Sequence, residues 1–589
     1  MQYHFFASLA VIVISGAATA QDVQLVADNA RGNLSDASLL RQLEEDADPQ
    51  DFIAAARADY RRLLTALYAQ GYYGGTISIT IDGIEASTLS PLATLSEIGT
   101  VVITVDSGPR FKFGQADITP LPPQADLPDS FASGRTARSG RIESAVSTGL
   151  TSWHDLGYAR ARVDSQQITA QHEASHLDVA VTIATGRQLT FGALSVGGNE
   201  NVRSSRIKEI AGLPTGDVYS PDALEKSESR LRRTGAFDSV AITISPTNGP
   251  NDTLPVDAQV VETKPRRFGF GLELSSIEGL TLSSFWLHRN LLGGAERFRV
   301  DGEVSGIDGE TGGIDYSLST TFTRPATFGA DTDFFVRSEI SRDDEPNFLL
   351  DSISVETGVS RIINEDLTVE AAIGVLRASE QSDVGNREFT LFTLPLKATL
   401  DRRDDPHNAM AGYYVDVSAT PFISFDDEIS GVQLFNDNRI YQKLGTRVTL
   451  AARGQLGSVI GADLDEAPAE FLFFSGGGGT VRGHSFQSLG IDREIDGETV
   501  STGGASFAGV QLEARVSATD AISVVGFYDA GYVGETEIIL EDGDWQGGVG
   551  LGLRYNTGIG PIRLDIGTEA DDQQFGESLQ FYIGIGQAF

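Results

Sequence analysis

The sequence predicts an α+β region followed by an all-β domain: three tandem β-α-α-β-β repeats and then a 16-stranded antiparallel transmembrane β-barrel. Glycines recur along the first region at a spacing of 78 residues, as Gly108 and Gly186 show. After Pro265, apolar residues alternate with glycine or polar residues in segments that continue to the end of the chain. A period of two is typical of strands that have one apolar face.

Residues 1–20 have the features of a secretory signal peptide. A short apolar run over Phe5–Ile14 is followed by Ala18-Thr19-Ala20, a small-x-small cleavage pattern. We expect cleavage before Gln21, and a buried N-terminal strand is the alternative. Beyond residue 20 there is no run of ~18 apolar residues of the kind that predicts a membrane helix. The exported chain is therefore expected in the periplasm or as an outer-membrane barrel.

The composition restricts the chemistry that is available to the chain. Its 589 residues include no cysteine, which excludes disulfides, thiolate metal sites and cysteine nucleophiles. The formal net charge of -38 argues against nucleic acid as a partner. The 65 glycines and two methionines favour glycine-rich β-structure over helical packing.

The three repeats are expected at residues 21–110, 111–188 and 189–264. The third is the clearest, because a strand over Leu189–Val196 precedes a short helix over Val202–Ala211. A second helix and two strands follow. A small sheet with two helices on one face is the natural packing for this order of elements.

The predicted barrel extends over residues 265–589. We count sixteen strands, among them one over 386–402 and a last one over 579–589. A strand needs about 9–11 residues to cross a bilayer, and an even number of strands lets the barrel close with both ends on one side. In lipid every backbone polar group must be paired, so the last strand must close on the first, near Phe268–Leu274. A large soluble β-domain is the alternative.

One glycine-rich segment, Ser475–Phe486, differs from the strands around it. Four glycines, Gly476–Gly479, lead to a single arginine, Arg482. Because glycine permits tight turns and close backbone approach, the segment is predicted to be a loop that places one guanidinium in a confined space. No Lys-Ser/Thr follows the glycines, so a phosphate loop is not indicated.

We find no catalytic motif and no metal site in the sequence, and we expect neither enzymatic activity nor a cofactor. His172-Glu173-Ala174-Ser175-His176 matches the H-E-x-x-H zinc pattern, but that chemistry needs a helix and this segment joins two predicted strands. The acidic segments Asp463–Glu466 and Asp492–Glu498 are expected to be solvated loops, with binding of divalent cations as the alternative. A solvated helix face, or else contact with an acidic partner, is expected for three arginines of the third repeat, Arg230, Arg232 and Arg233.

Tandem β-α-α-β-β units before a C-terminal barrel resemble the POTRA-barrel superfamily of outer-membrane insertases and secretion transporters. Val481-Arg482-Gly483 is similar to the Val-Arg-Gly-aromatic motif of this family, which lies at the tip of the sixth extracellular loop and folds back into the lumen. His484 departs from the motif, with Phe486 two residues later. Phe527-Tyr528-Asp529-Ala530-Gly531 is similar to the family's Phe-x-Asp-x-Gly strand motif.

The resemblance implies that Arg482 pairs with Asp529 and fixes the loop inside the lumen. An arginine in such a place loses hydration unless a carboxylate meets it with two hydrogen bonds. Strand alternation can turn Asp529 inward with Phe527 and Gly531, which leaves Tyr528 facing lipid. An isolated pair of this kind predicts that reversing both charges restores the protection from protease that either single reversal loses.

The number of repeats resembles the TamA-type branch of the superfamily, because BamA-type general insertases carry five repeats and two-partner secretion transporters carry two. The resemblance implies periplasmic repeats that bind an inner-membrane-anchored, TamB-like partner. It also implies that unfolded β-barrel or autotransporter-type clients are inserted into the lipid of the Gram-negative outer membrane. The alternatives are a polypeptide-secreting transporter, a BamA-like general insertase and a passive porin.

Insertion is expected at a weak lateral seam between the first and last barrel strands. Glycine interrupts both strands and weakens their pairing, so a client strand could compete for the edge. The residues expected at this seam are Phe268, Gly269, Phe270, Gly271, Gly584, Gly586 and Phe589.

Overall fold

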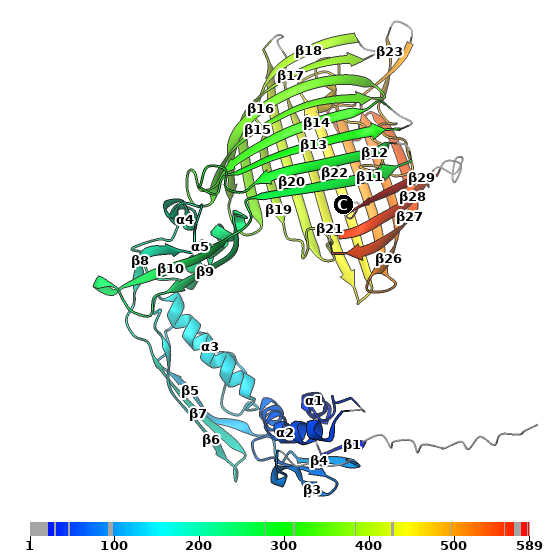
Figure 1. Cartoon of the computed structure of the whole chain (residues 1–589). Helices are drawn as coiled ribbons and strands as arrows, with labels where there is room; N and C mark the ends of the chain where they lie inside the picture. The colour runs from blue at the N-terminus through cyan, green and yellow to red at the C-terminus, as the bar shows by residue number, and fades with distance from the viewer. Residues whose placement is uncertain are drawn as a thin grey trace, which may run out of the picture. The chain divides into compact units, whose positions relative to one another are not determined.

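The computed structural model describes residues 22–28, 31–44, 47–91, 98–276, 278–309, 312–382, 385–425, 429–495, 498–558, 560–570, 579–585, 587 and 589. Three small α+β units precede a large β-barrel (Figure 1). The predicted signal peptide, residues 1–20, lies outside the described residues. In the described part of the chain, no helix combines the length and the apolar character needed to cross a bilayer.

The first unit combines a four-stranded sheet of order β1-β4-β2-β3 with two helices. Its elements are β1 (Asp22–Ala27), α1 (Arg31–Ala37), α2 (Pro49–Gln70), β2 (Thr76–Ile81), β3 (Ile84–Glu85), η1 (Ala86–Thr88) and β4 (Thr100–Asp106). Pro49 begins α2, where its missing N–H costs no hydrogen bond, and Gly71 ends the helix with a φ of 92°. Leu63 and Leu67 lie on the buried face of α2 and pack into one core with Ile79.

The second unit differs from the predicted repeat because it contains a single α-helix. Its elements are β5 (Lys112–Thr119), α3 (Ser139–Asp155), β6 (Arg162–Gln171) and β7 (His176–Ala184), with the sheet order β5-β7-β6. Proline removes a helical hydrogen bond and clashes with the preceding turn. The segment between β5 and α3 contains four prolines, Pro120, Pro122, Pro123 and Pro128.

The H-E-x-x-H segment lies at the hairpin between β6 and β7. His172–Ser175 forms the turn, and His176 is the first residue of β7. Among the described residues, no group of three or more His, Cys, Asp or Glu side chains is arranged to hold a metal ion.

The third unit has the predicted order of elements. They are β8 (Thr190–Gly197), α4 (Ser204–Ala211), α5 (Pro221–Arg233), β9 (Phe237–Ile244), η2 (Pro250–Asp252) and β10 (Thr253–Glu262), and the sheet order is β8-β10-β9. Ile207 and Ile210 of α4 and Leu231 of α5 are fully buried, so each helix turns one apolar side to the interior.

The barrel is an antiparallel sheet closed by pairing of its first and last strands. Its segments are β11 (Arg266–Ser275), β12 (Gly279–His288), β13 (Arg297–Ile307), β14 (Asp315–Arg324), β15 (Thr332–Glu345), β16 (Phe348–Ile362), β17 (Leu367–Ser382), β18 (Gly385–Thr393), β19 (Leu396–Asp401), β20 (Gly412–Ser424), β21 (Ser430–Leu444), β22 (Val448–Ile460), β25 (Ser506–Ser517), β26 (Ile522–Gly534), β27 (Gly543–Thr557), β28 (Gly560–Glu569) and β29 (Gln580–Ile585). Two of these segments, β18 and β19, both pair with β17 and with β20, so they are halves of one strand. The 17 segments therefore make 16 barrel strands, as predicted.

The predicted strand over 386–402 is interrupted rather than continuous. The break falls at Leu394-Pro395, between β18 and β19. Proline has no N–H to donate to a ladder, which confines it to strand ends, edges and bulges.

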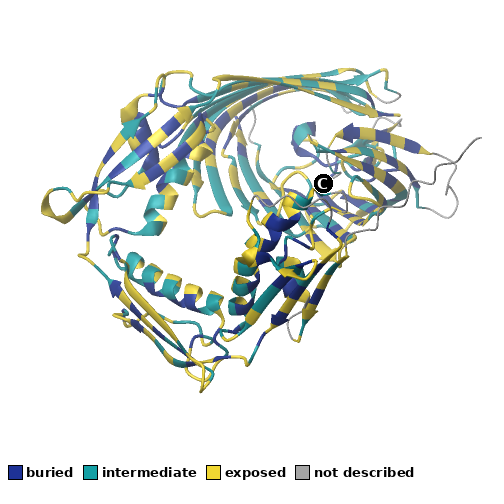
Figure 2. Cartoon of the chain, turned by 60° about the horizontal axis from the view of Figure 1, so that its bottom comes forward, coloured by how far each residue is buried: buried dark blue, intermediate teal, exposed yellow. Residues whose placement is uncertain are grey.

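Side chains alternate between the two faces of the barrel wall, as the striped strands of Figure 2 show. Ile340 and Ile353 are direct partners across β15 and β16, and both are exposed on the outer face. Their neighbours Ser341 and Ser352 face the lumen and share a hydrogen bond of 3.0 Å. An apolar outer face and a polar inner face are what a bilayer requires of a barrel.

The seam between β11 and β29 is the shortest ladder described in the barrel wall. Only Leu274↔Ile583 and Ser275↔Tyr582 are paired there among the described residues, whereas β11 makes ten pairs with β12 and β15 makes 14 with β16. Beyond the ladder, an ion pair between Glu273 and Arg563 also crosses the seam. Over Phe268–Leu272 this edge of β11 therefore has no ladder partner among the described residues.

Two of the arginines expected on a solvated helix face instead contact the barrel. Arg230 and Arg233 of α5 both donate to Asp331 in the turn between β14 and β15, at 2.6–3.0 Å. Arg206 of α4 donates to a main-chain oxygen of the same turn at 2.5 Å. Arg232 pairs within its own helix. The two arginines are attracted by a carboxylate in a barrel turn. The alternation of residues along strands does not identify such a partner.

We expect the main-chain amides of β11 that point away from β12 to exchange hydrogen faster than those of β16. Their positions over Phe268–Leu272 have no described partner strand, whereas β16 is paired with β15 at 14 positions and with β17 at 15. Hydrogen–deuterium exchange of the chain in lipid nanodiscs, read by mass spectrometry, measures both. Equal protection of the two strands would contradict an open seam.

Candidate functional site in the barrel lumen

The glycine-rich segment lies within the long connection between β22 and β25. A β-bridge between Ser475 and Leu489 closes its base, and we call residues 475–489 the lumen loop. Before it, η3 (Ala469–Phe471) leads into the loop; after it, β23 (Ile491–Ile495) and β24 (Glu498–Thr502) form a hairpin. The acidic segments 463–466 and 492–498 flank the lumen loop, and residues 496–497 are outside the described part.

Aromatic residues fix the approach to the lumen loop. Phe471 packs on Phe422 of β20, with ring centroids 5.0 Å apart. Phe473 stacks between Phe435 of β21 and Phe507 of β25. These rings belong to one buried apolar cluster, so the connection is held against the inner wall before it reaches the glycines.

The glycines of the lumen loop are required by its geometry. Gly476, Gly477 and Gly483 have φ values of 118°, 86° and 100°, a region that residues with a side chain rarely adopt. A Cβ on Gly483 would also lie 2.5 Å from the main chain of Thr568 in β28. The loop therefore turns sharply and presses its backbone against the barrel wall.

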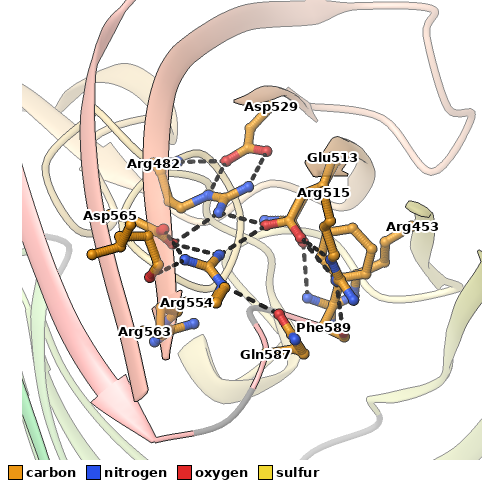
Figure 3. Close-up of polar contacts among 12 residues, drawn as sticks. Arg453, Arg482, Glu513, Arg515, Asp529, Arg554, Arg563, Asp565, Gln587 and Phe589 are labelled. Carbon is orange, nitrogen blue, oxygen red and sulfur yellow. Dashed lines mark hydrogen bonds and ion pairs between the residues drawn. The ribbon is translucent and has the colours of Figure 1, made fainter. Parts of the chain in front are cut away.

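Arg482 meets Asp529 in a two-pronged ion pair (Figure 3). Nε donates to Asp529 Oδ2 at 2.7 Å and Nη2 donates to Oδ1 at 2.9 Å. The main-chain N–H of Arg482 adds a third bond, of 3.1 Å, to Oδ2. Arg482 is 1% exposed, and its guanidinium lies 3.6 Å from the centroid of the Phe527 ring. This is the pairing that the family motif implies.

Two further carboxylates contact the same guanidinium. Nη1 of Arg482 donates to Glu513 of β25 at 2.9 Å and to Asp565 of β28 at 3.1 Å. Arg554 of β27 bonds both of these carboxylates, and Arg515 of β25 bonds Glu513 at 2.8 Å. We call the six residues the lumen ion cluster: Arg482, Glu513, Arg515, Asp529, Arg554 and Asp565.

The lumen ion cluster is balanced in charge, with three guanidinium groups and three carboxylates, all buried. Burial alone would lower the pKa of Arg482, but hydrogen bonds and charges from Asp529, Glu513 and Asp565 outweigh it and raise the pKa. The arginine thus stays charged. Buried charges are tolerated only when they are paired and hydrogen-bonded, and each member of the cluster is.

Two other motif residues position the lumen loop: Gly531 leaves space for it, and His484 bonds it to the barrel wall. The ring Nε2 of His484 lies 2.7 Å from Gly547 O, so it donates to this carbonyl of β27. A Cβ on Gly531 would lie 2.1 Å from Ser475 Oγ and 2.9 Å from the fully buried Val481, which explains glycine there. His484 therefore anchors the loop by a hydrogen bond in place of an aromatic contact.

The expected seam residues do not all lie at the seam. Phe268 and Phe270 are 65% and 86% exposed on the outer face of β11. A Cβ on Gly269 would lie 2.1 Å from the Phe285 ring, and a Cβ on Gly271 would lie 2.3 Å from Ser283 Oγ. Gly584 is in β29 and Gly586 is outside the described residues.

Phe589 turns into the lumen instead of pairing with β11. It is buried beside Tyr441 of β21, and Arg515 donates to its main-chain oxygen at 3.4 Å. Gln587 accepts a hydrogen bond of 3.2 Å from Arg554 and donates to Asn408 at 2.8 Å. Two arginines of the lumen ion cluster thus bind Gln587 and Phe589. Of the predicted strand over 579–589, the described strand β29 covers Gln580–Ile585.

Sequence reasoning found Arg482 and Asp529 but missed Glu513, Asp565 and the two other arginines. The sequence nevertheless contains a pattern that indicates two of these residues. Glu513 and Arg515 are two apart on one strand, between outward-facing apolar residues, so both point inward. Charged residues at inward positions on the strands beside a recognised motif are candidates for the same network.

We expect Arg482→Ala to destabilise the barrel by about 3–5 kcal/mol, because it leaves buried carboxylates without their shared partner. Urea unfolding of the full chain in lipid vesicles measures the change. Arg299→Ala is the matched control: Arg299 pairs with Asp301 and is about half exposed, so its loss should cost no more than ~1 kcal/mol. Equal effects of the two substitutions would contradict the assignment.

The three carboxylates also change the expected result of charge reversal. An aspartate at position 482 would face Glu513 and Asp565 as well as an arginine at position 529. We therefore expect the R482D/D529R double variant to remain as sensitive to protease in the lumen loop as each single variant. Full restoration of protection would show that Arg482 and Asp529 act as an isolated pair.

Two family models match the chain. The Omp85 superfamily domain matches residues 290–589, just over half of the chain. The POTRA model, described as a surface antigen variable number repeat, matches residues 189–263, which include the third α+β unit.

The chain is also similar to proteins of known identity. It is 24% identical over 458 residues to the outer membrane protein assembly factor BamA of Nitratidesulfovibrio vulgaris, a match that covers 74% of this chain and 56% of that protein. The structure of Haemophilus ducreyi BamA lacking POTRA domains 1–3 matches with a TM-score of 0.63 and 17% identity over 81% of this chain and all of that one. CdiB from Escherichia coli matches with a TM-score of 0.50 and 13% identity over 92% and 99%.

These structural likenesses show the fold, and the chain spans little more than half the length of the curated BamA relative. The match to the Omp85 model identifies the family of the barrel, and the match to the POTRA model identifies the domain that precedes the barrel. The chain therefore belongs to the Omp85 superfamily and is an outer-membrane β-barrel protein with periplasmic POTRA structure.

Proposed function

We propose that this protein is an assembly factor that inserts β-barrel or autotransporter-type clients into the outer membrane through the seam between β11 and β29. The observation that carries the proposal is the ladder of two described pairs at this seam, whereas the other junctions between barrel strands have six to fifteen described pairs. A barrel that only needed to be stable would pair its closing strands fully, because unpaired backbone groups are costly in lipid.

The exposed edge of β11 offers a client strand main-chain hydrogen-bond partners. Over Phe268–Leu272 the strand has one edge bonded to β12 and the other without a described partner, while its outward side chains are apolar. A client strand can add to such an edge by main-chain hydrogen bonds, as in β-augmentation. Its own apolar side chains then face lipid, so each added strand buries backbone polar groups and exposes apolar ones to the bilayer.

The lumen is a less suitable route for a secreted chain. The aromatic base around Phe471 and Phe473 packs on the inner wall, and Arg482 is bound by carboxylates on three strands. Moving the lumen loop aside would break these contacts and expose charges to one another. A two-partner secretion transporter or a passive porin needs an open lumen, so the packed loop favours insertion at the seam.

The periplasmic region supports a TamA-type protein in our proposal. The three α+β units before the barrel would be three POTRA domains that bind an inner-membrane-anchored, TamB-like partner and receive unfolded clients. The BamA-like general insertase is the alternative, favoured by the BamA relative and its fold. No step of insertion requires catalysis or a cofactor, and we propose that the protein is not an enzyme.

An edge strand of the second unit is the surface we propose for partner binding. β6 lies at the edge of its sheet and its residues are exposed along most of their length. An edge of this kind presents unpaired main-chain groups to an extended segment of another protein.

A disulfide across the seam should abolish client insertion. Leu274 and Ile583 are direct partners on the outer face, and the chain has no cysteine of its own, so L274C/I583C creates one defined cross-link. We expect the oxidised variant to lose insertion of a model barrel client and the reduced variant to retain it, measured in proteoliposomes.

The matched control is a disulfide between two strands that are already fully paired. Ile340 and Ile353 are direct partners on the outer face of β15 and β16. Oxidised I340C/I353C should insert clients as well as the parent does. Unimpaired insertion by the oxidised seam variant would rule out insertion through the seam.

A photo-cross-linking residue in β6 should capture the inner-membrane-anchored partner. We expect an adduct with the full chain carrying the probe at Gln167, an exposed residue of this edge strand. The control probe at Glu143, exposed on α3, should give none. Adducts of the same partner from both positions, or from neither, would contradict binding at the edge of β6.

A further inference from the structure

The lumen loop bonds to elements on both sides of the seam. The main-chain N–H of Gly478 donates to Glu278 Oε1 at 2.9 Å, and Glu278 belongs to the turn between β11 and β12. The N–H of Gly483 donates to Tyr582 Oη at 3.2 Å, and Tyr582 belongs to β29. One short stretch of loop therefore joins the first strand's turn to the last strand.

Both bonds lie at the end of the seam where β11 and β29 are paired. Tyr582 is itself the ladder partner of Ser275. The hydroxyl of Ser275 accepts a hydrogen bond of 3.2 Å from the main-chain N–H of Glu278. The main-chain N–H of Ser276 adds a bond of 3.0 Å to Phe581 O. The contacts of the loop thus reach the same few residues that close the barrel.

The glycines beside Arg482 fit closely between these two side chains. A Cβ on Gly477 would lie 2.6 Å from Glu278 Oε1. A Cβ on Gly478 would lie 3.3 Å from the ring of Tyr582, tighter than an ordinary contact. The run of glycines therefore allows the backbone itself to pass between the two sides of the seam.

The lumen ion cluster fixes the position of this stretch. Arg482 stands between Gly478 and Gly483 in the sequence, and its guanidinium is bound by Asp529, Glu513 and Asp565. The loop cannot leave Glu278 and Tyr582 without either bending sharply or breaking these ion pairs. Charge pairing in the lumen and closure of the seam are therefore connected through a few residues of backbone.

We propose that residues 476–483 act as a clasp that holds the seam closed, through Glu278 on one side and Tyr582 on the other. The clasp is a property of the barrel alone. The further step, in which release of the clasp admits a client strand, rests on the proposed function. Glu278 and Tyr582 are positioning residues, because they act through the loop and the ladder.

The separation of the strands that flank the seam tests the clasp without measuring insertion. Leu282 of β12 and Leu564 of β28 are exposed on the outer face and leave the seam strands themselves unaltered. Three strand spacings lie between them, roughly 15 Å. With nitroxide labels on L282C and L564C in the full chain in lipid nanodiscs, spin–spin distances report the open fraction of the seam.

We expect Glu278→Ala and Tyr582→Phe each to raise the open fraction about fivefold, the effect of losing one ordinary hydrogen bond. The double variant should raise it further. Glu278→Gln keeps an acceptor oxygen and should retain the parent's distance distribution. Tyr528→Phe removes a hydroxyl from an outward-facing tyrosine of β26 and should also leave the distribution unchanged.

Two results would overturn the clasp. One is an unchanged distance distribution in the folded Glu278→Ala/Tyr582→Phe double variant, with folding checked by heat-modifiable migration. The other is a shift for Glu278→Gln as large as that for Glu278→Ala, because the acceptor would then be irrelevant. Loss of client insertion without a change in distance would count against the clasp and leave insertion at the seam to be judged by the disulfide variants.

Discussion

The burial of a charged arginine inside the barrel is the constraint on which the rest of this structure depends. Arg482 is only 1% exposed, and an unpaired charge buried to this extent would be very costly. Four consecutive strands, β25 to β28, each supply a charged side chain to the network around it. The position of the lumen loop, the glycines that let it approach the wall and the inward course of the chain beyond β29 all follow from satisfying these charges.

A second constraint comes from the bilayer, which requires every backbone polar group in the wall to be paired. Among the described residues, the junction between β11 and β29 has two ladder pairs, whereas the neighbouring junction between β28 and β29 has six. Two arginines of the ion cluster also bind Gln587 and Phe589, which follow β29 in the sequence. Strong interactions in the lumen thus coexist with a short ladder in the wall, and the lumen loop that these interactions fix bonds to both sides of that ladder.

Much of the fold could be predicted from the sequence because strand alternation is a local property. The number of barrel strands and the order of elements in the third unit follow from the spacing of apolar residues. Alternation also places Asp529 inward. What could not be predicted depends on which elements meet in space: Glu513 and Asp565 converge on Arg482 only because of the register between neighbouring strands. Asp331 as the partner of Arg230 and the inward turn of Phe589 are of the same kind, and four prolines removed a helix that the repeat pattern predicted.

The most direct measurement is a structure of the chain in a lipid bilayer with a client barrel stalled during insertion. We expect a client strand hydrogen-bonded to the edge of β11, with β29 displaced from Leu274 and Ser275. The ion pairs of Arg482 with Asp529, Glu513 and Asp565 should remain in place while the seam is open. A client segment inside the lumen, with the ladder between β11 and β29 intact, would contradict insertion through the seam.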